Sequence, residues 1–272
     1  MKRLVALTLA APVALAACNF STERTDKQAQ NEAQTQLAKA DAPNITPVDS
    51  ETIRAEGVVA NGIVIADLDA IELGPKIVGP VGPEVEASLA TPLAAIGDLS
   101  SWVVCPPRLT AGEGEKGVKI ERCEPGNMAP GTVYTYVHAV TPGVDRPNDR
   151  PFAQPEAVTM PAAIQAFRVT VPLAGFTGKA GYSFGDATRA LGKDGAISVA
   201  CLQQAIVYAI TAPKGGWRKG QTIRFFWQST VPPAGPAAKY ELAADGKRGI
   251  GAGPAPAQPE NGDGPALNVP CG

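Results

Sequence analysis

Residues 222–231, which read TIRFFWQSTV, decide the fold class because large apolar side chains alternate with polar ones along them. Successive side chains of an extended chain point to opposite faces, so residues two apart share a face. One face of this stretch carries Ile223, Phe225, Trp227 and Val231. The opposite face carries Thr222, Arg224, Gln228 and Thr230. The stretch is therefore predicted to be a β-strand that buries one face.

The same two-residue period recurs elsewhere in the chain. In residues 132–140, one face carries Val133, Thr135, Val137 and Ala139, and the other carries Tyr134, Tyr136 and His138. A further shared face carries Phe167, Val169, Val171 and Leu173. Residues 196–211 are mostly apolar and are predicted to form one buried strand or two. Residues 58–60 and 63–65 flank Asn61-Gly62, which is the signature of a β-hairpin with a type I′ turn.

Repeated short strands predict a mainly β protein with an antiparallel β-sandwich or barrel-like body. The 29 glycines and 26 prolines among 272 residues fit many turns between such strands. Helical stretches are few and short. The best candidates are residues 85–96, which Pro92 interrupts, and residues 161–167.

The charge balance argues against nucleic acid as a partner. The chain has 24 Lys and Arg residues against 26 Asp and Glu residues, so its formal net charge is −2. Proteins that bind nucleic acid neutralise phosphates with a surplus of basic side chains. No such surplus exists here.

The N-terminus reads as an export signal. Lys2 and Arg3 precede fourteen uncharged, mostly apolar residues, 4–17. As a helix these would span about 21 Å, which is short of the roughly 30 Å hydrocarbon core of a membrane. A secretory signal peptide over residues 1–17 is the better interpretation.

The run ends in Leu15-Ala16-Ala17-Cys18, which resembles the lipobox of bacterial lipoproteins. The resemblance is confined to this segment and implies that an acyl lipid such as palmitate is attached at Cys18, with cleavage before it. Asn19 follows where lipoproteins of the inner membrane often carry Asp, so the resemblance implies sorting to the outer membrane, with the body in the periplasm. Exposure of the body at the cell surface is left open. No cofactor other than this lipid is predicted.

The composition of the remaining chain predicts three segments. Residues 18–50 are polar and are predicted to be a flexible tether. Residues 51–272 are predicted to be the β-rich body, which forms either one unit or two lobes, 51–130 and 131–272. The Pro/Gly-rich residues 232–272 are predicted to be a wrapping or loose tail.

Four cysteines remain once Cys18 is assigned to lipid. In an oxidising compartment four cysteines allow three pairings. The preferred pairing joins Cys105 with Cys123, which would clamp a polar loop, and Cys201 with Cys271, which would hold the tail. A zinc site is disfavoured because the chain has no C-x-x-C spacing and a single histidine. No metal site is predicted.

One motif could carry a reaction. Residues 181–185 read GYSFG and match G-x-S-x-G, a turn that can present a nucleophilic serine, here Ser183. Such a serine needs a base, and His138 precedes it, whereas the histidine follows the serine in α/β-hydrolases. A lipid-anchored serine hydrolase is therefore kept as the alternative, and a structural turn is preferred.

Two charged segments have structural interpretations. Asp67, Asp69 and Glu72 lack the spacing of a calcium loop and are predicted to form a solvent face. Residues 145–150 form a stiff charged loop between prolines, interpreted as self-paired surface charges or a contact loop for a partner.

The strongest binding candidate is residues 214–220, KGGWRKG, a hairpin tip with Trp217 beside Arg218 and Lys219. An exposed ring there could stack on a glycan, whereas the alternative is that Trp217 folds back onto the body. The sequence thus predicts a non-enzymatic binding or scaffolding module of the cell envelope. Its partner would be another envelope protein or a glycan, and a purely structural role is a further alternative.

Overall fold

The computed structural model describes residues 58–60, 62–78, 84–109, 117–147, 149, 157–202, 204–213 and 216–257. All of them belong to one compact unit, residues 42–272. The predicted signal peptide, the lipidation site Cys18, the tether and Cys271 lie outside the described residues. None of the helices in the described ranges has the length and apolar character needed to cross a membrane.

The described elements are mainly strands. In chain order these are β1 (Val58–Ala60), β2 (Ile63–Asp67), β3 (Val85–Ala90), β4 (Ala95–Val104), β5 (Arg108–Leu109), β6 (Val118–Lys119), β7 (Tyr134–Pro142), β8 (Ile164–Val169), β9 (Phe176–Tyr182), β10 (Ala196–Leu202), β11 (Ala205–Thr211), β12 (Ile223–Ser229), β13 (Pro233–Ala244) and β14 (Lys247–Pro256). The helical elements are the 3-10 turns η1 (Leu68–Ala70) and η2 (Pro125–Asn127) and the α-helix α3 (Phe184–Leu191).

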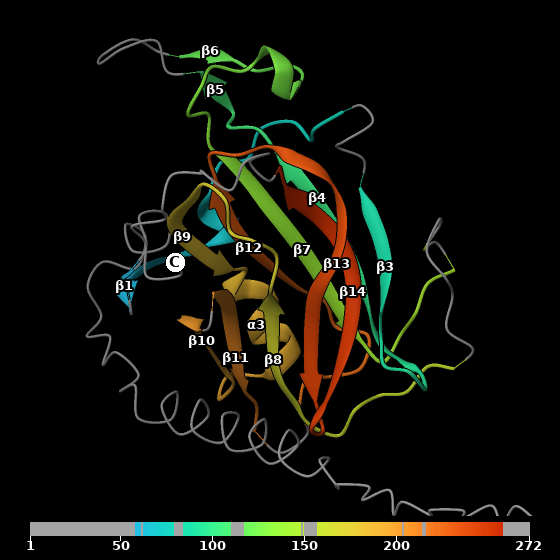
Figure 1. Ribbon diagram of the computed structural model, residues 1–272. Helices are drawn as coiled ribbons and strands as arrows, with labels where there is room; N and C mark the ends of the chain where they lie inside the picture. Colours follow the sequence, from blue (N-terminus) through green and yellow to red (C-terminus); the bar gives the residue numbers. More distant parts are fainter. Residues whose placement is uncertain are drawn as a thin grey trace, which may run out of the picture. The chain divides into compact units, whose positions relative to one another are not determined.

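Twelve of these strands form one large, nearly closed sheet, so the predicted mainly β, barrel-like fold is confirmed (Figure 1). The strand order is β1-β2-β9-β12-β7-β4-β3-β14-β13-β8-β11-β10, and β5 and β6 form a small second sheet. The pairing is antiparallel except between β2 and β9, which run parallel. Strands from residues 58–104 and from residues 134–256 therefore alternate within the same sheet.

The interior is filled by aromatic side chains from strands that are distant in the sheet order. Phe167 of β8 lies 5.0 Å from Phe225 of β12, measured between ring centroids. His138 of β7 lies 4.5 Å from Tyr240 of β13. The sheet therefore folds over on itself, and its inner face is a packed core in the manner of a sandwich or small barrel.

Several predicted strands are confirmed. Ile223, Phe225 and Trp227 are fully buried on one face of β12. The face with Phe167 and Val169 is buried as well, and residues 58–65 form the hairpin of β1 and β2. Residues 196–202 and 205–211 form two strands, β10 and β11, whose antiparallel pairing extends to Leu202 and Ala205.

Both predicted helices are wrong. Residues 85–96 contain β3, a turn at Pro92 and the start of β4. Val85, Ala87 and Leu89 point into the core, whereas Glu86 and Ser88 lie on the other face. Residues 161–167 run into β8, whose inward face includes Phe167. Good helix formers such as Ala, Glu and Leu are overridden here by pairing and burial.

The prediction of a loose tail is wrong for residues 232–257, because β13 and β14 form a long hairpin in the middle of the sheet order. Glycine makes this close packing possible. A Cβ atom on Gly253 would lie 2.7 Å from the ring of Tyr240, and one on Gly249 would lie 2.6 Å from Ile96. The high glycine content thus serves contact between strands as well as turns.

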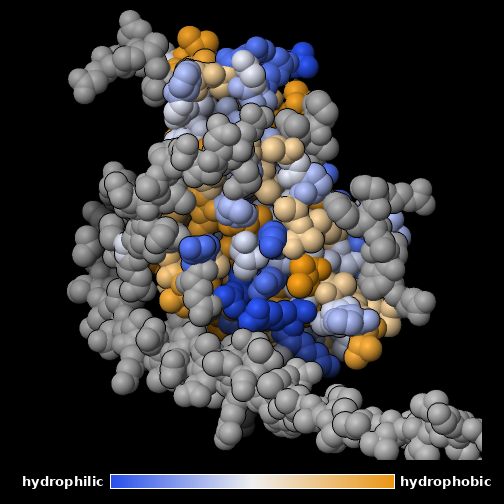
Figure 2. Space-filling view, in the orientation of Figure 1, coloured by the Kyte–Doolittle hydropathy of each residue, from blue (hydrophilic) through white to orange (hydrophobic). Residues whose placement is uncertain are grey.

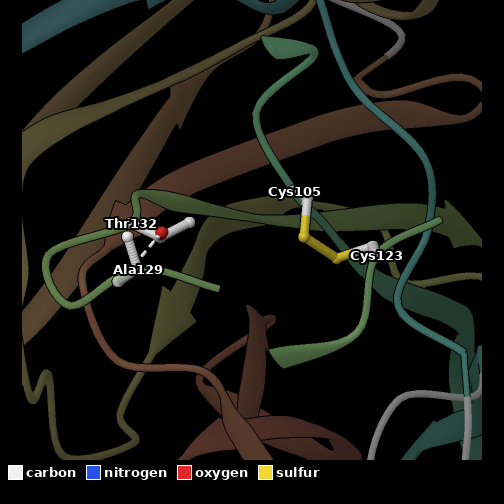
Figure 3. Close-up of a disulfide and its surroundings, with 4 residues drawn as sticks. All are labelled: Cys105, Cys123, Ala129 and Thr132. Carbon is white, nitrogen blue, oxygen red and sulfur yellow. Dashed lines mark hydrogen bonds between the residues drawn. A yellow bond between two sulfur atoms is a disulfide. The ribbon is translucent and has the colours of Figure 1, made fainter. Parts of the chain in front are cut away.

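The predicted disulfide between Cys105 and Cys123 is confirmed, with 5.5 Å between the Cα atoms (Figure 3). Both cysteines are buried, and the bond closes the segment that carries β5 and β6. After Cys123 the chain turns back, where the Thr132 hydroxyl donates to the Ala129 carbonyl at 2.7 Å. Cys201 is also disulfide-bonded. Its predicted partner Cys271 lies outside the described residues.

Candidate functional site

The G-x-S-x-G motif forms the junction between β9 and α3. Strand β9 ends at Tyr182, and Ser183 is the N-cap of α3, with an ordinary extended backbone (φ −73°, ψ 114°). Gly181 is required because β2 approaches closely here, so that a Cβ atom would lie 2.0 Å from the Ala66 carbonyl oxygen. The motif therefore does form a strand-to-helix turn, but its first glycine and its serine have structural tasks.

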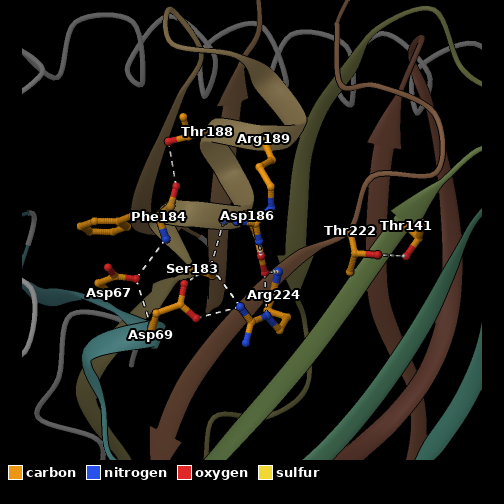
Figure 4. A network of polar contacts seen from close by, with 10 residues as sticks. All are labelled: Asp67, Asp69, Thr141, Ser183, Phe184, Asp186, Thr188, Arg189, Thr222 and Arg224. Carbon is orange, nitrogen blue, oxygen red and sulfur yellow. Dashed lines mark hydrogen bonds and ion pairs between the residues drawn. The ribbon is translucent and has the colours of Figure 1, made fainter.

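Ser183 is buried and its hydroxyl is fully used (Figure 4). It donates to Asp69 Oδ2 at 2.5 Å and accepts from the backbone N–H of Asp186 at 3.0 Å. Arg224 Nη2 also donates to it, at 3.3 Å. A hydroxyl offers one hydrogen and two lone pairs, so these contacts exhaust it.

Arg224 of β12 joins the other members of this polar network, which Figure 4 shows between η1, α3 and β12. Its Nε donates to Asp186 Oδ2 at 2.6 Å, and its Nη2 donates to Asp69 Oδ1 at 2.7 Å. The hydrogen bond that Arg224 donates to Asp186 is the largest cause that raises the pKa of Arg224, and the charges of Asp186 and Asp69 act in the same direction. Arg189 forms a second ion pair with Asp186.

The acidic residues singled out from the sequence are divided by the fold. Asp67 Oδ1 accepts from the backbone N–H groups of Asp69, at 3.2 Å, and Phe184, at 3.0 Å. Asp69 is paired with Arg224 and Ser183, whereas Glu72 is exposed and takes no part in the network. The prediction of a plain solvent face is wrong for Asp67, which is buried. Asp69 is exposed as predicted, but its pairing with Ser183 and Arg224 ties η1 to the start of α3.

His138 lies inside the body, away from this network. Its Nδ1 contacts the Ser101 hydroxyl at 3.0 Å, and its Nε2 accepts from the Trp227 indole N–H at 3.1 Å. Burial lowers the pKa of His138 to about 3. Ser183 and His138, the two residues that the serine-hydrolase alternative requires, are thus bonded to separate partners and are not brought together.

Trp217 folds back onto the body, which is the alternative that the sequence analysis set against stacking on a ligand. Only 1% of its surface is exposed, and its indole N–H donates to the Gln221 carbonyl at 2.7 Å. Its ring packs edge-on against Phe225. A large apolar ring gains more from this burial than from exposure at a tip.

Arg218 and Lys219 remain exposed, and Arg218 lies beside the C-terminal end of α3. The Arg218 guanidinium donates to the Arg189 carbonyl at 3.1 Å, and its backbone N–H donates to the Ala190 carbonyl at 3.1 Å. Cations are favourable at this end of a helix, where carbonyls lack intrahelical partners. The predicted hairpin is wrong, because β11 and β12 are not neighbours in the sheet. Arg218, in the segment between them, instead caps α3, a role that the sequence interpretation missed.

The sequence analysis also did not identify a second cluster of acidic residues. Asp98 of β4 and Asp149, from the segment after β7, are buried, and they lie close to the half-buried Asp145. Surface self-pairing is therefore the wrong interpretation for Asp149. The available signal was the alternation in residues 85–90, which places Ser88 on the face that these carboxylates cover.

Comparison with protein-family models, with curated proteins and with solved structures finds no significant match.

Proposed function

We propose that this protein is a lipid-anchored binding or scaffolding module of the bacterial cell envelope. Its anchor would be the acylated Cys18 at the outer membrane, and its β-rich body would lie in the periplasm. The Cys105–Cys123 disulfide supports export, because disulfides persist mainly in oxidising compartments. The filled interior favours binding at the surface over enclosure of a ligand within the sheet.

The observation that carries the binding role is an exposed basic surface around the end of α3. It is formed by Arg189, Lys193, Arg218 and Lys219, with Asp194 as its exposed acid. Figure 2 shows hydrophilic residues gathered over the position that α3 has in Figure 1. Such a surface suits an anionic partner, either a glycan or an acidic patch of an envelope protein.

The anchor is tested by the Cys18→Ser variant of the full chain. Without the thiol no acyl chain can be attached, so the protein is expected to move entirely from the membrane fraction to the soluble periplasmic fraction. Immunoblots of fractionated cells measure this. A Ser variant that stays with the outer membrane would refute the anchor.

The binding surface is tested by charge reversal at two of its exposed lysines. The Lys193→Glu/Lys219→Glu variant is expected to bind its envelope partner about tenfold more weakly, or by about 1.4 kcal/mol, because it places acids opposite an anionic ligand. The measurement is quantitative cross-linking in intact cells, followed by capture of the anchored protein.

The matched control is Lys239→Glu/Lys247→Glu, which makes the same charge change at exposed lysines of β13 and β14. It is expected to retain the cross-linked adducts of the wild type. Equal loss in both variants would mean that overall charge, and not this surface, governs binding.

A further inference from the structure

Four oxygen-bearing side chains meet on the outer face of β3 and β4. Ser88 and Asp98 are direct partners in the register of these strands. Asp145 and Asp149 come from the segment that follows β7 and lies over them. The cluster is separate from the network around Ser183 and from the basic surface.

The three carboxylates crowd together. Each offers an oxygen, and these oxygens all lie within 4.8 Å of one another. Ser88 joins two of the residues, since its hydroxyl lies 2.9 Å from Asp145 Oδ1 and also hydrogen-bonds to Asp149 Oδ2. The backbone N–H of Ser88 donates to the same Asp149 oxygen at 2.7 Å.

Asp149 Oδ1 has no hydrogen-bond partner among the described residues, although Asp149 is fully buried, with 0% of its surface exposed. A buried carboxylate oxygen without a partner is costly, because it has lost its water and gained nothing in return. The Ser88 hydroxyl cannot relieve this, since its single hydrogen faces two carboxylate oxygens. The remaining contact is relieved either by a proton on the carboxyl group or by a cation bound beside it.

Within the described part of the chain, no buried basic side chain supplies a cation to these carboxylates. Among the described residues, Arg146 is the basic side chain paired with the cluster, but it is 58% exposed, and its Nε lies 3.7 Å from Asp98 Oδ2. The hydrogen bond from the backbone N–H of Arg146 to Asp98 Oδ1 is also long, at 3.4 Å.

We propose that Asp98, Asp145 and Asp149 bind a calcium ion, with the Ser88 hydroxyl at the edge of the site. Calcium takes oxygen ligands at about 2.3–2.6 Å, so oxygens on opposite sides of it stand about 5 Å apart. The 4.8 Å limit fits within that span. The donors are all oxygens, which suits a hard cation and not zinc or copper. Water would complete the coordination.

Calcium binding predicts a specific thermal shift. At a free Ca²⁺ concentration about ten times the dissociation constant, the unfolding midpoint of the full chain is expected to rise by about 3–6 °C relative to EDTA. The Asp98→Asn and Asp149→Asn variants remove ligand charge while keeping the shape of the side chain, and both should lose this shift. In EDTA, Asp98→Asn should unfold at a temperature at least as high as the wild type, because it relieves repulsion.

The matched control is Asp194→Asn, which removes the same charge from an exposed position and should keep the full shift. Calorimetric titration with CaCl₂ gives a second readout that does not depend on unfolding. The proposal is overturned if Ca²⁺ leaves the wild-type midpoint unchanged or if the shift persists in both cluster variants. An equal or larger shift with Mg²⁺ would overturn the assignment to calcium.

Discussion

Lowering the pH from about 7.5 to about 4 is expected to cost the wild-type protein about 3 kcal/mol more unfolding free energy than it costs a His138→Gln variant. The main cause is burial, which disfavours the charged imidazole, and the two hydrogen bonds of the ring fit only its neutral form. The Trp227 indole N–H can only donate, so Nε2 of His138 must accept and the ring proton must lie on Nδ1, which donates to Ser101. Protonation of Nε2 would place its N–H directly opposite the Trp227 indole N–H and break this hydrogen bond.

The sign follows from proton binding in the two states. The folded pKa of His138 is about 3, below the ordinary value of 6.5 that the unfolded chain has. Between these values the unfolded state binds a proton and the folded state does not, so acid favours unfolding. The contribution of neutral His138 is intact above about pH 6.5 and is lost as the pH falls towards about 3. No charged side chain is among its described contacts, which are Ser101, Phe167, Trp227 and Tyr240.

Urea unfolding of both proteins at the two pH values measures the effect. Glutamine can accept from Trp227 and donate to Ser101 without titrating, so it removes the pH dependence of this position alone. Carboxylates also titrate in this range, but they do so equally in both proteins. If the wild type and the variant lose the same free energy, His138 is not the source of acid sensitivity.

Replacement of Arg224 by Met is expected to lower the free energy of unfolding by about 3 kcal/mol. Arg224 satisfies Asp186, whose side chain is only 7% exposed, and it also pairs with Asp69. Without Arg224, the buried carboxylate of Asp186 loses one of its two paired cations, the less exposed one, and α3 loses its tie to β12. The estimate sits at the lower end for a buried pair because Arg224 is itself 36% exposed.

Arg189→Met provides a matched comparison, since Arg189 pairs with the same Asp186 but is 66% exposed. Solvent screens such a pair, so the loss should be about 0.5 kcal/mol. Chemical unfolding monitored by tryptophan fluorescence gives both values. Similar losses for the two variants would contradict the assignment of Arg224 as the centre of the network.

The sequence predicted those strands in which large apolar side chains alternate clearly with polar ones. Ile223, Phe225 and Trp227 alternate with polar residues, and the structure buries them. Residues 85–90 alternate too, but the small and helix-favouring residues among them hide the period. The tail was misjudged because proline and glycine usually mark loops, whereas Gly249 and Gly253 here allow close packing of β14.

The site depended on contacts that no local pattern encodes. Ser183 and Asp69 are 114 residues apart in sequence, and only the parallel pairing of β2 with β9 brings them together. The direction of Trp217 was equally hidden, since an aromatic residue at a turn can face water or the core. Local motifs thus located the turn around Ser183 correctly but gave no account of what its hydroxyl contacts.

The place of the C-terminal hairpin in the sheet has a consequence for how the chain is made. β13 and β14 lie between β3 and β8, both of which are synthesised well before them. Until residues 233–256 arrive, β3 and β8 each leave one strand edge unpaired, and open edges invite pairing between chains. During its synthesis the chain is therefore prone to aggregation until β13 and β14 have formed and paired with β8 and β3.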